Sequence, residues 1–249
     1  MAGHSHWANI KHKKAKTDAK RGKVWGKCAK AIMVAAKHGG PDPSANLALR
    51  YAIDEARFEN MPRDTIERAV KKGAGELGAD TYEFIRYEGY GPAGVAIIAD
   101  ALTDNRTRTA GELRLAFTKY GGNLGASGCV AYLFEHRGQL TVTGERATEE
   151  ALMSAALDAG ARDVWLEEGL WTVTCAPADL MALKDALEAA GISTDSAEIT
   201  MAPQTLTEIT GDAVAKAVKL IEALEDNDDI QKVYTNLDAS SEALEAALG

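Results

Sequence analysis

The sequence predicts an α+β protein with a helical N-terminal three-helix domain followed by two ferredoxin-like α/β domains, one inserted in the other. Apolar residues recur at helical spacing through the first part of the chain, and strand-like runs alternate with amphipathic helices after it. The 249 residues are enough for two or three compact domains, and the 46% of hydrophobic residues is enough to fill their cores. We expect a basic arm and helical domain at 1–78, a discontinuous α/β domain at 79–135 plus 204–249, and an inserted ferredoxin-like domain at 136–203.

The first predicted helix spans residues 19–38. Its apolar residues, from Val24 to Ala35, follow i, i+4, i+7, i+8 and i+11 spacing and therefore cover one face. Lysines fall on a separate, adjacent arc, and the run Gly39-Gly40-Pro41 ends the helix. The helix is therefore predicted to have a core face beside a lysine stripe.

Two shorter helices are predicted to complete this domain. The second spans about 45–59, with Ser44 as its N-cap. The third begins at Pro62, which suits a first helical turn, and Asp64 lies near its positive end. Gly73 is its predicted C′ residue. Three short helices can bury one small shared core, so we expect a helical domain with a basic face.

From residue 80 the pattern is that of an α/β protein. The predicted strands are Tyr82–Glu88, Val95–Leu102, Val130–Phe134, Gln139–Thr143, Asp163–Glu167, Leu170–Thr174, Ser196–Met201, Thr205–Ile209 and Ile230–Thr235. The predicted helices are Thr107–Tyr120, Thr148–Ala159, Ala178–Ala190 and Asp212–Leu224. Residues 139–201 thus follow the β-α-β-β-α-β order of a ferredoxin-like unit. The flanking pieces, 95–134 and 205–235, each follow β-α-β and are predicted to form the two halves of a second unit.

The charge of the chain is segregated. The net charge is −9, but residues 1–30 hold nine Lys and Arg residues against one acid. Residues 79–249 hold 12 basic and 29 acidic residues, which gives −17. A basic head on an acidic body is typical of a protein that binds a polyanion.

The basic segment is the main candidate site. Its cations neutralise phosphates and release counterions, and such contacts position a protein on nucleic acid without reading sequence. The alternative to nucleic-acid binding is that the basic segment is a solvated tail with no partner. The candidate nucleic-acid-binding residues here are Lys11, Lys13, Lys14, Lys16, Lys20, Arg21, Lys23, Lys27 and Lys30.

Aromatic and histidine residues accompany the basic segment. Trp7 is a candidate for stacking on an unpaired base, and docking onto the body of the protein is the equal alternative. His4, His6 and His12 have no carboxylate or thiol at ligand spacing, so no metal site is predicted.

Two further motifs in the α/β body are candidates for a site. The run Gly89–Gly94 matches G-x-G-x-x-G, but a strand follows it where a dinucleotide site requires a helix, so it predicts a turn. Arg106 and Arg108 precede or open the first helix of the body and are candidates for a second nucleic-acid contact. Local pairing with the helix cap or with Glu112 is the alternative.

Several classes of protein are excluded by composition. No run approaches the ~20 apolar residues of a membrane span, and the start of the chain lacks the apolar core of a secretory signal. Three scattered cysteines predict buried thiols in a reducing compartment rather than disulfides. No nucleophile, base or metal constellation supports an enzyme, and no cofactor is predicted. The expected location is cytoplasmic.

Five ordered stretches resemble the YebC/PmpR family. They are Met1–Lys14, Asn60–Ala69, Tyr87–Val95, Thr103–Thr109 and Gly121–Gly125 leading to Phe134. One departure is His6, which stands where a lysine is common. The resemblance implies one helical and two α/β domains, without catalysis or a cofactor. It also implies one of two roles, because bacterial members are usually described as DNA-binding transcriptional regulators, whereas others resemble translation factors at the ribosome.

The resulting hypothesis is a non-enzymatic, nucleic-acid-binding regulator of gene expression, formally a DNA-binding transcriptional regulator. The alternative is a ribosome-associated translation factor that binds rRNA or tRNA and eases translation of proline-rich sequences. No predicted helix groups base-reading side chains at its start, which favours the alternative. The expected partners are DNA or ribosomal RNA, and the ribosome, but no membrane and no small-molecule substrate. The sequence does not determine oligomeric state, target sequence or regulated genes.

Overall fold

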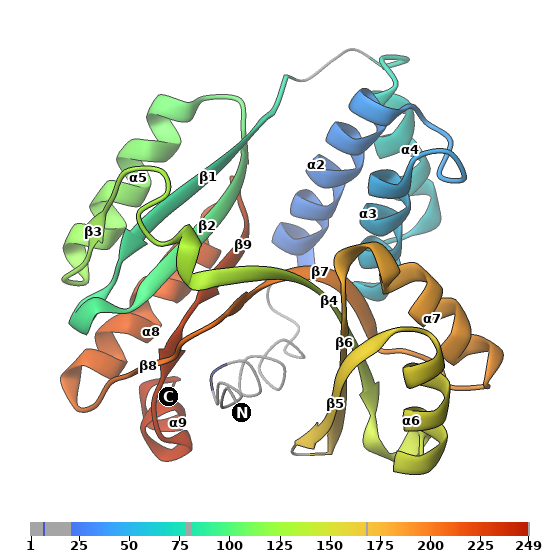
Figure 1. Cartoon of the computed structure of the whole chain (residues 1–249). Helices are drawn as coiled ribbons and strands as arrows, with labels where there is room; N and C mark the ends of the chain where they lie inside the picture. Colours follow the sequence, from blue (N-terminus) through green and yellow to red (C-terminus); the bar gives the residue numbers. More distant parts are fainter. Residues whose placement is uncertain (1–6, 8–20, 78–80, 168, 249) are drawn as a thin grey trace. The chain divides into compact units, whose positions relative to one another are not determined.

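The chain forms two compact units, residues 1–134 with 203–249 and residues 135–202 (Figure 1). The computed structural model describes residues 7, 21–77, 81–167 and 169–248. The second unit lies within one residue, at each end, of the domain predicted as an insertion. The helical region belongs to the first unit.

The helical region consists of three helices around one small core. They are α2 (Arg21–Gly39), α3 (Leu47–Phe58) and α4 (Arg63–Gly73). Ile32, Leu49 and Ala56 are fully buried in their shared apolar cluster. The half-buried Trp25 closes one side, since its indole Nε1 donates to the carbonyl of Glu59 at 3.0 Å. The three predicted helices are confirmed.

The start of α3 differs from the prediction. The N-cap is Asn46, not Ser44, because the Asn46 carboxamide oxygen accepts from the backbone N–H of Leu49 at 3.1 Å. The amide nitrogen of Asn46 also donates to the carbonyls of Ala35 and Gly40, each at 2.8 Å. A carboxamide both accepts and donates, so Asn46 caps α3 and ties it to the end of α2 at once. A serine hydroxyl has fewer donors for this double role.

The prediction that Gly73 is the C′ residue of α4 is wrong. Gly73 is the last helical residue, and Gly75 is the residue with positive φ, +89°. The absence of a side chain at Gly73 instead permits close packing on α2. A Cβ there would lie 2.8 Å from Cα of Met33 and 2.9 Å from Cβ of Ala36, and closer still to the Met33 carbonyl oxygen.

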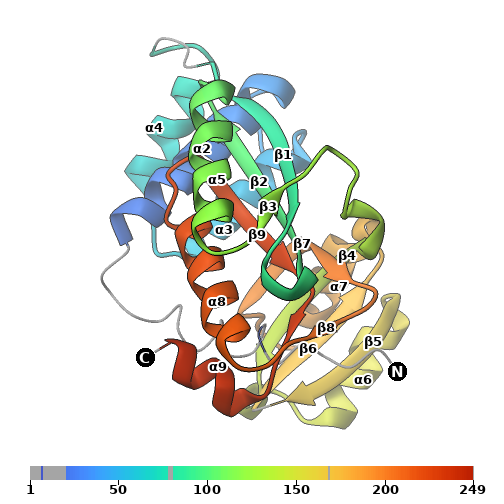
Figure 2. The same ribbon diagram turned by 90° about the vertical axis from the view of Figure 1, so that its left-hand side faces the viewer.

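The rest of the first unit is an antiparallel sheet with two helices on one face (Figures 1 and 2). Its strand order is β3-β1-β2-β9. The elements are β1 (Glu83–Tyr90), β2 (Ala96–Thr103), α5 (Arg106–Lys119), β3 (Asn123–Leu124), α8 (Asp212–Glu225) and β9 (Ile230–Thr235). Ile97, Phe117 and Leu220 are at most 1% exposed in the apolar cluster between sheet and helices. The short helix α9 (Ser241–Leu248) packs against α8.

This domain departs from the split order that was expected for its halves. The strand β8 (Thr207–Glu208) does not join the main sheet and instead pairs in parallel with β10 (Leu237–Asp238). The main sheet instead contains β1. This strand pairs with β2 in an antiparallel hairpin, in a register that runs from Glu83↔Thr103 to Tyr90↔Ala96. The segments before and after the inserted unit therefore form a sheet of order β3-β1-β2-β9, and not the two β-α-β halves that were expected.

The predicted strand at Val130–Phe134 is also not formed. Residues Ala131–Leu133 make a 3₁₀ turn. The buried carboxylate of Glu88 accepts from the backbone N–H groups of Gly128, Val130 and Ala131 at 2.8–2.9 Å. Because a side chain uses these donors, they are not available to a neighbouring strand.

The inserted unit has the predicted β-α-β-β-α-β order. Its elements are β4 (Phe134–Thr143), α6 (Glu149–Asp158), β5 (Ala161–Glu167), β6 (Leu170–Cys175), α7 (Leu180–Ala189) and β7 (Ser196–Pro203). The strand order is β5-β6-β4-β7, and α6 and α7 lie on one face of the sheet (Figure 1). Leu140, Val173, Leu152 and Leu183 are fully buried. With the helical domain and the two α/β parts in place, the predicted fold class is confirmed.

We expect the substitution Gly73→Ala to destabilise the helical region. Alanine normally improves a helix over glycine by about 0.5–1 kcal/mol, but here its methyl group meets the backbone of Met33, and overpacking costs about 1–3 kcal/mol. The matched control is Gly111→Ala in α5, where a Cβ has no described heavy atom within 4 Å. Urea unfolding followed by circular dichroism should show loss of stability for the first and a small gain for the second. Equal gains for both would contradict the close contact.

Candidate nucleic-acid interface

The basic segment is only partly within the described structure. Lys11, Lys13, Lys14, Lys16 and Lys20 lie outside the described residues. Arg21 is the first residue of α2. The candidates with described side chains are therefore Lys23, Lys27 and Lys30 on α2, Arg106 and Arg108 on α5, and Trp7.

The lysine stripe of α2, defined here as Lys23, Lys27 and Lys30, contacts an acidic turn of the same unit. The spacing i, i+4, i+7 places the three side chains on one side of the helix. Lys23 Nζ donates to the carbonyl of Asp226 at 3.1 Å, and Lys27 Nζ donates to the carbonyl of Glu225 at 2.5 Å. Lys30 Nζ donates to the carbonyl of Asp228 at 2.9 Å. The stripe predicted to bind phosphate is thus engaged within the protein.

The acidic turn, residues 225–229, connects α8 to β9. It begins at Glu225, the last residue of α8. The carbonyl groups at a helix C-terminus have no intrahelical partners and carry the negative end of the helix dipole. Lysine ammonium groups are therefore suitable donors at this position.

Burial changes the pKa of Lys27. Burial lowers the pKa of its ammonium group, while the negative charges of Glu225, Asp228 and Asp226 act in the opposite direction. The net pKa is below its ordinary value. The acidic turn thus compensates part of the hydration that Lys27 loses.

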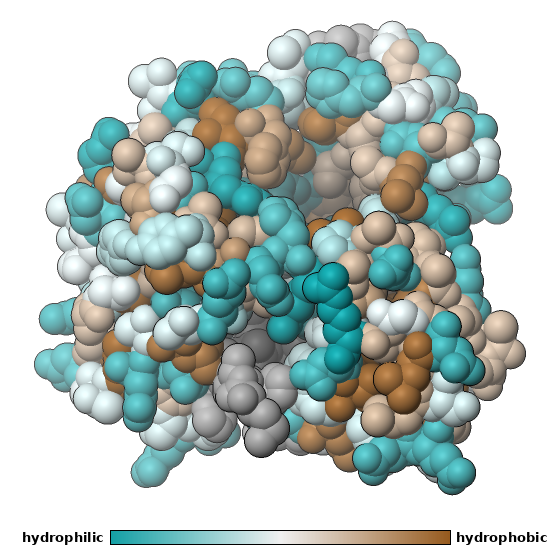
Figure 3. All heavy atoms as spheres, viewed as in Figure 1, coloured by the Kyte–Doolittle hydropathy of each residue, from teal (hydrophilic) through white to brown (hydrophobic). Residues whose placement is uncertain are grey.

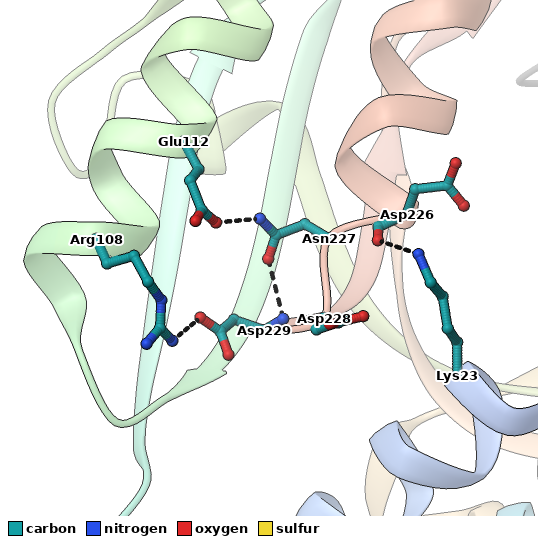
Figure 4. A pocket seen from close by; sticks show the side chains of 7 residues that line it. All are labelled: Lys23, Arg108, Glu112, Asp226, Asn227, Asp228 and Asp229. Atoms are coloured by element: carbon teal, nitrogen blue, oxygen red, sulfur yellow. Dashed lines mark hydrogen bonds and ion pairs between the residues drawn. The ribbon is translucent and has the colours of Figure 1, made fainter.

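Asp229 is the most connected residue of the turn. Its carboxylate is 5% exposed and accepts from four side chains (Figure 4 shows the contact with Arg108). The donors are Lys30 Nζ at 3.0 Å, Arg108 Nη2 at 2.6 Å, Thr109 Oγ1 at 2.8 Å and Thr103 Oγ1 at 3.2 Å. One carboxylate therefore joins α2, the first turn of α5 and the end of β2.

These donors determine the pKa of Asp229. Burial acts to raise it, but hydrogen bonds from Arg108, Lys30 and Thr109 outweigh burial and lower the pKa to about 2. Asp229 is therefore ionised across the physiological range.

The two arginines of the body are not equivalent. Arg108 pairs with Asp229 and also with Asp104 at 2.9 Å, which is the local pairing weighed as the alternative, although with Asp229 rather than Glu112. Glu112 instead accepts from the amide of Asn227 at 2.7 Å (Figure 4). Both arginines are exposed, but the guanidinium of Arg108 is held by these two ion pairs.

A small polar cavity of about 310 Å³ lies at this junction (Figure 4). It is lined by Lys23, Arg108, Glu112, Asp226, Asn227, Asp228 and Asp229. Within the described residues no group of three His, Cys, Asp or Glu side chains is arranged to hold a metal ion.

Trp7 is buried. Its side chain is 7% exposed and belongs to the apolar cluster of the α/β sheet, which also contains residues of α8 and β9. This is the docking alternative. A base cannot stack on an indole that is buried in an apolar cluster, so Trp7 is not among the accessible contact residues.

The partner of the lysine stripe was not foreseen from the sequence. The only signal was the opposite charge of the run Glu225–Asp229, about 200 residues away. Charge density indicates that a segment attracts ions of the other sign, but it does not identify which segment supplies them.

The surface of the protein has both hydrophilic and apolar areas. On the face drawn in Figure 3, hydrophilic side chains are widespread and apolar ones gather in separate areas. No helix in the described part of the chain is long and apolar enough to span a membrane.

Two family models match most of the chain. One, described as the TACO1/YebC protein N-terminal domain, matches residues 5–76. The other, described as the TACO1/YebC second and third domain, matches residues 82–237. Together they cover the helical region and both α/β parts.

Full-length relatives and a solved structure agree with this match. A "Probable transcriptional regulatory protein" of Syntrophotalea carbinolica is 50% identical over 249 residues, with 100% of each chain covered. One of the same description from Cupriavidus pinatubonensis is 54% identical, covering 95% of this chain and 98% of the relative. The crystal structure of a conserved hypothetical protein from Aquifex aeolicus is similar with a TM-score of 0.86 and 47% identity, covering 95% of this chain and 98% of that chain.

We expect Asp229→Asn to lower stability at neutral pH but not in strong acid. A group whose pKa is lowered on folding contributes stability above its unfolded pKa, near 4, and loses it as the pH falls through the folded value, about 2. The expected loss at pH 7 is on the order of 2 kcal/mol. Urea unfolding of both proteins between pH 7 and 2 should show the difference shrinking below about pH 4. Asp158→Asn, at an exposed position of α6, is the control and should show no such convergence.

We also expect Trp7→Ala to lower stability rather than to remove a base contact. Truncating a buried tryptophan costs about 3–5 kcal/mol. Thermal unfolding measures this loss, and Trp7→Phe should recover part of it. An unchanged melting temperature together with weaker binding to single-stranded RNA would instead support stacking.

Proposed function

Because this chain belongs to the TACO1/YebC family, we propose that it is a nucleic-acid-binding regulator of gene expression, formally a DNA-binding transcriptional regulator. Two relatives that match over nearly their full length are described as transcriptional regulatory proteins. The observation that carries the proposal is the charge distribution, with nine basic residues and one acid in residues 1–30 of a chain whose net charge is −9.

The proposed contact is electrostatic. Lys11, Lys13, Lys14, Lys16 and Lys20, followed by Arg21 at the start of α2, hold phosphate groups and release condensed counterions. Contacts to about six phosphates would make log K fall with log salt at a slope of about −5. Arg106 supplies a second, smaller contact on the body.

A second candidate function is translation. The lysine stripe of α2 contacts the acidic turn, so α2 does not present this side to a DNA major groove in the structure described here. A ribosome-associated factor needs no groove-reading helix, because structured RNA is recognised largely through shape and phosphate contacts. This observation favours the ribosome as the place where the basic segment acts.

The protein acts in this proposal without catalysis and without a cofactor. Its location is the cytoplasm, where its three cysteines, which are free thiols, stay reduced. Regulation then follows from where the protein binds, not from a reaction that it performs.

The basic segment is tested by charge reversal. Lys13→Glu with Lys14→Glu should weaken binding to nucleic acid about tenfold or more at 0.15 M salt and reduce the salt slope by about 2, since each phosphate contact contributes about 0.9. Fluorescence anisotropy over a salt series measures both. The matched control, Arg162→Glu with Lys219→Glu at exposed positions of the body, makes the same change in net charge and should change the slope little. Equal effects of the two variants would contradict the assignment.

The choice between DNA and the ribosome is tested by competition. Wild-type protein and the variant Lys13→Glu with Lys14→Glu are mixed with promoter duplex, scrambled duplex or intact ribosomes. Each of the three is supplied at the same concentration of phosphate groups. Preference for one duplex over its scrambled form supports transcription. Retention on ribosomes that depends on Lys13 and Lys14 supports translation, and binding to none of them contradicts both functions.

A further inference from the structure

The contact between α2 and the acidic turn joins two separately packed parts. The apolar cluster of the helical region and that of the α/β sheet share no residue. Charged groups span the junction, including Lys23, Lys27 and Lys30 from α2 and a pair between Lys232 of β9 and Glu55 of α3 at 3.3 Å. A junction held mainly by charges opens more readily than one held by a shared apolar core, and it weakens with salt.

The acidic turn offers the lysine stripe the same chemistry as a phosphate backbone. Four acids, Glu225, Asp226, Asp228 and Asp229, occur within five residues. Carbonyl oxygens at the end of α8 add acceptors with partial negative charge. Three lysines on one side of a helix, each bonded to anionic or carbonyl oxygen, are in the arrangement that they would need to follow successive phosphates.

The contact of the lysine stripe with the acidic turn and its contact with phosphates are both electrostatic. Exposed charged contacts contribute little to stability, and Lys23, which donates to the carbonyl of Asp226, is exposed. Nucleic acid that is already held by the arm presents its phosphates at high local concentration next to α2, because Arg21 begins that helix. A polyanion can then compete with the turn for the stripe.

We propose that the acidic turn, residues 225–229, is an internal substitute for nucleic-acid phosphate that keeps the lysine stripe of α2 closed until bound nucleic acid displaces it. This inference rests on the proposed function, because it requires that the basic segment bind nucleic acid. The arm makes the first contact, and the release of the turn adds up to three phosphate contacts. The turn therefore limits the affinity of the resting protein for arbitrary polyanions.

Asp229 differs in role from the other acids of the turn. Its carboxylate also holds Arg108, Thr103 and Thr109, so removing it damages the body of the protein. The side chains of Asp226 and Asp228 are exposed, and that of Glu225 is half-buried. Neutralising these three weakens attraction for the stripe while leaving the Asp229 network in place.

The test is a triple variant of the full chain, Glu225→Gln, Asp226→Asn and Asp228→Asn. Its probes are a labelled 30-nucleotide single-stranded RNA and a 30-base-pair duplex DNA at about 0.15 M salt. We expect the dissociation constant to fall about three- to tenfold and the salt slope to steepen by about 2, because Lys23 and Lys27 gain phosphate contacts while Lys30 stays bonded to Asp229. The control carries the same charge change on α6, as Glu149→Gln, Glu150→Gln and Asp158→Asn, and reports the effect of net charge alone.

A second set of variants separates masking from general electrostatics. Lys23→Gln, Lys27→Gln and Lys30→Gln should cancel the gain when combined with the triple turn variant. In the otherwise wild-type chain the same lysine changes should weaken binding, since the open state uses the stripe. If the combined variant keeps the full gain, the stripe is not what the turn masks and the inference fails.

The wild-type protein provides a measurement that does not depend on how a variant folds. Hydrogen exchange of the amides in residues 225–229 should become faster when the RNA probe is saturating, because displacement exposes the turn. Unchanged or slower exchange would overturn the inference. If wild-type protein binds the probe and the turn variant is no tighter than the α6 control, only the inference fails. If wild-type protein binds neither probe, the proposed function fails as well.

Discussion

The arrangement of the first unit depends on a buried carboxylate, that of Asp229. An ionised carboxylate that leaves water loses several kcal/mol of hydration unless hydrogen bonds replace it. Lys30 of α2, Thr103 at the end of β2, and Arg108 and Thr109 in the first turn of α5 supply those bonds. The requirement to satisfy one charge therefore brings α2, α5 and the end of β2 together at the end of α8.

The same requirement explains why the helical region joins the body through polar contacts. Each of the two parts buries its apolar residues in a cluster of its own. Lysines on α2 and acids after α8 provide the attraction instead. Polar junctions of this kind are specific, because each donor needs its acceptor, and they are reversible, because water and salt compete for the same groups. A binding protein can use both properties.

Most of the fold was predictable because most of it is local. Apolar residues at helical spacing identified α2, and the β-α-β-β-α-β order identified the inserted unit. The predictions that proved wrong depend on distant partners. Asn46 replaces Ser44 as a cap because it also reaches the end of α2, and Val130 is not in a strand because Glu88 takes its N–H group. Sequence periodicity contains no information about such partners.

The candidate site divides in the same way. From the sequence alone, the segregation of charge and the fold class could be determined, because they follow from composition and spacing, whereas the class of ligand stays a prediction. Only the tertiary structure shows that Trp7 is buried and that Lys23, Lys27 and Lys30 face an acidic turn about 200 residues away. The physical reason is that a charge is defined by its residue, whereas its availability depends on which opposite charge the folded chain places beside it.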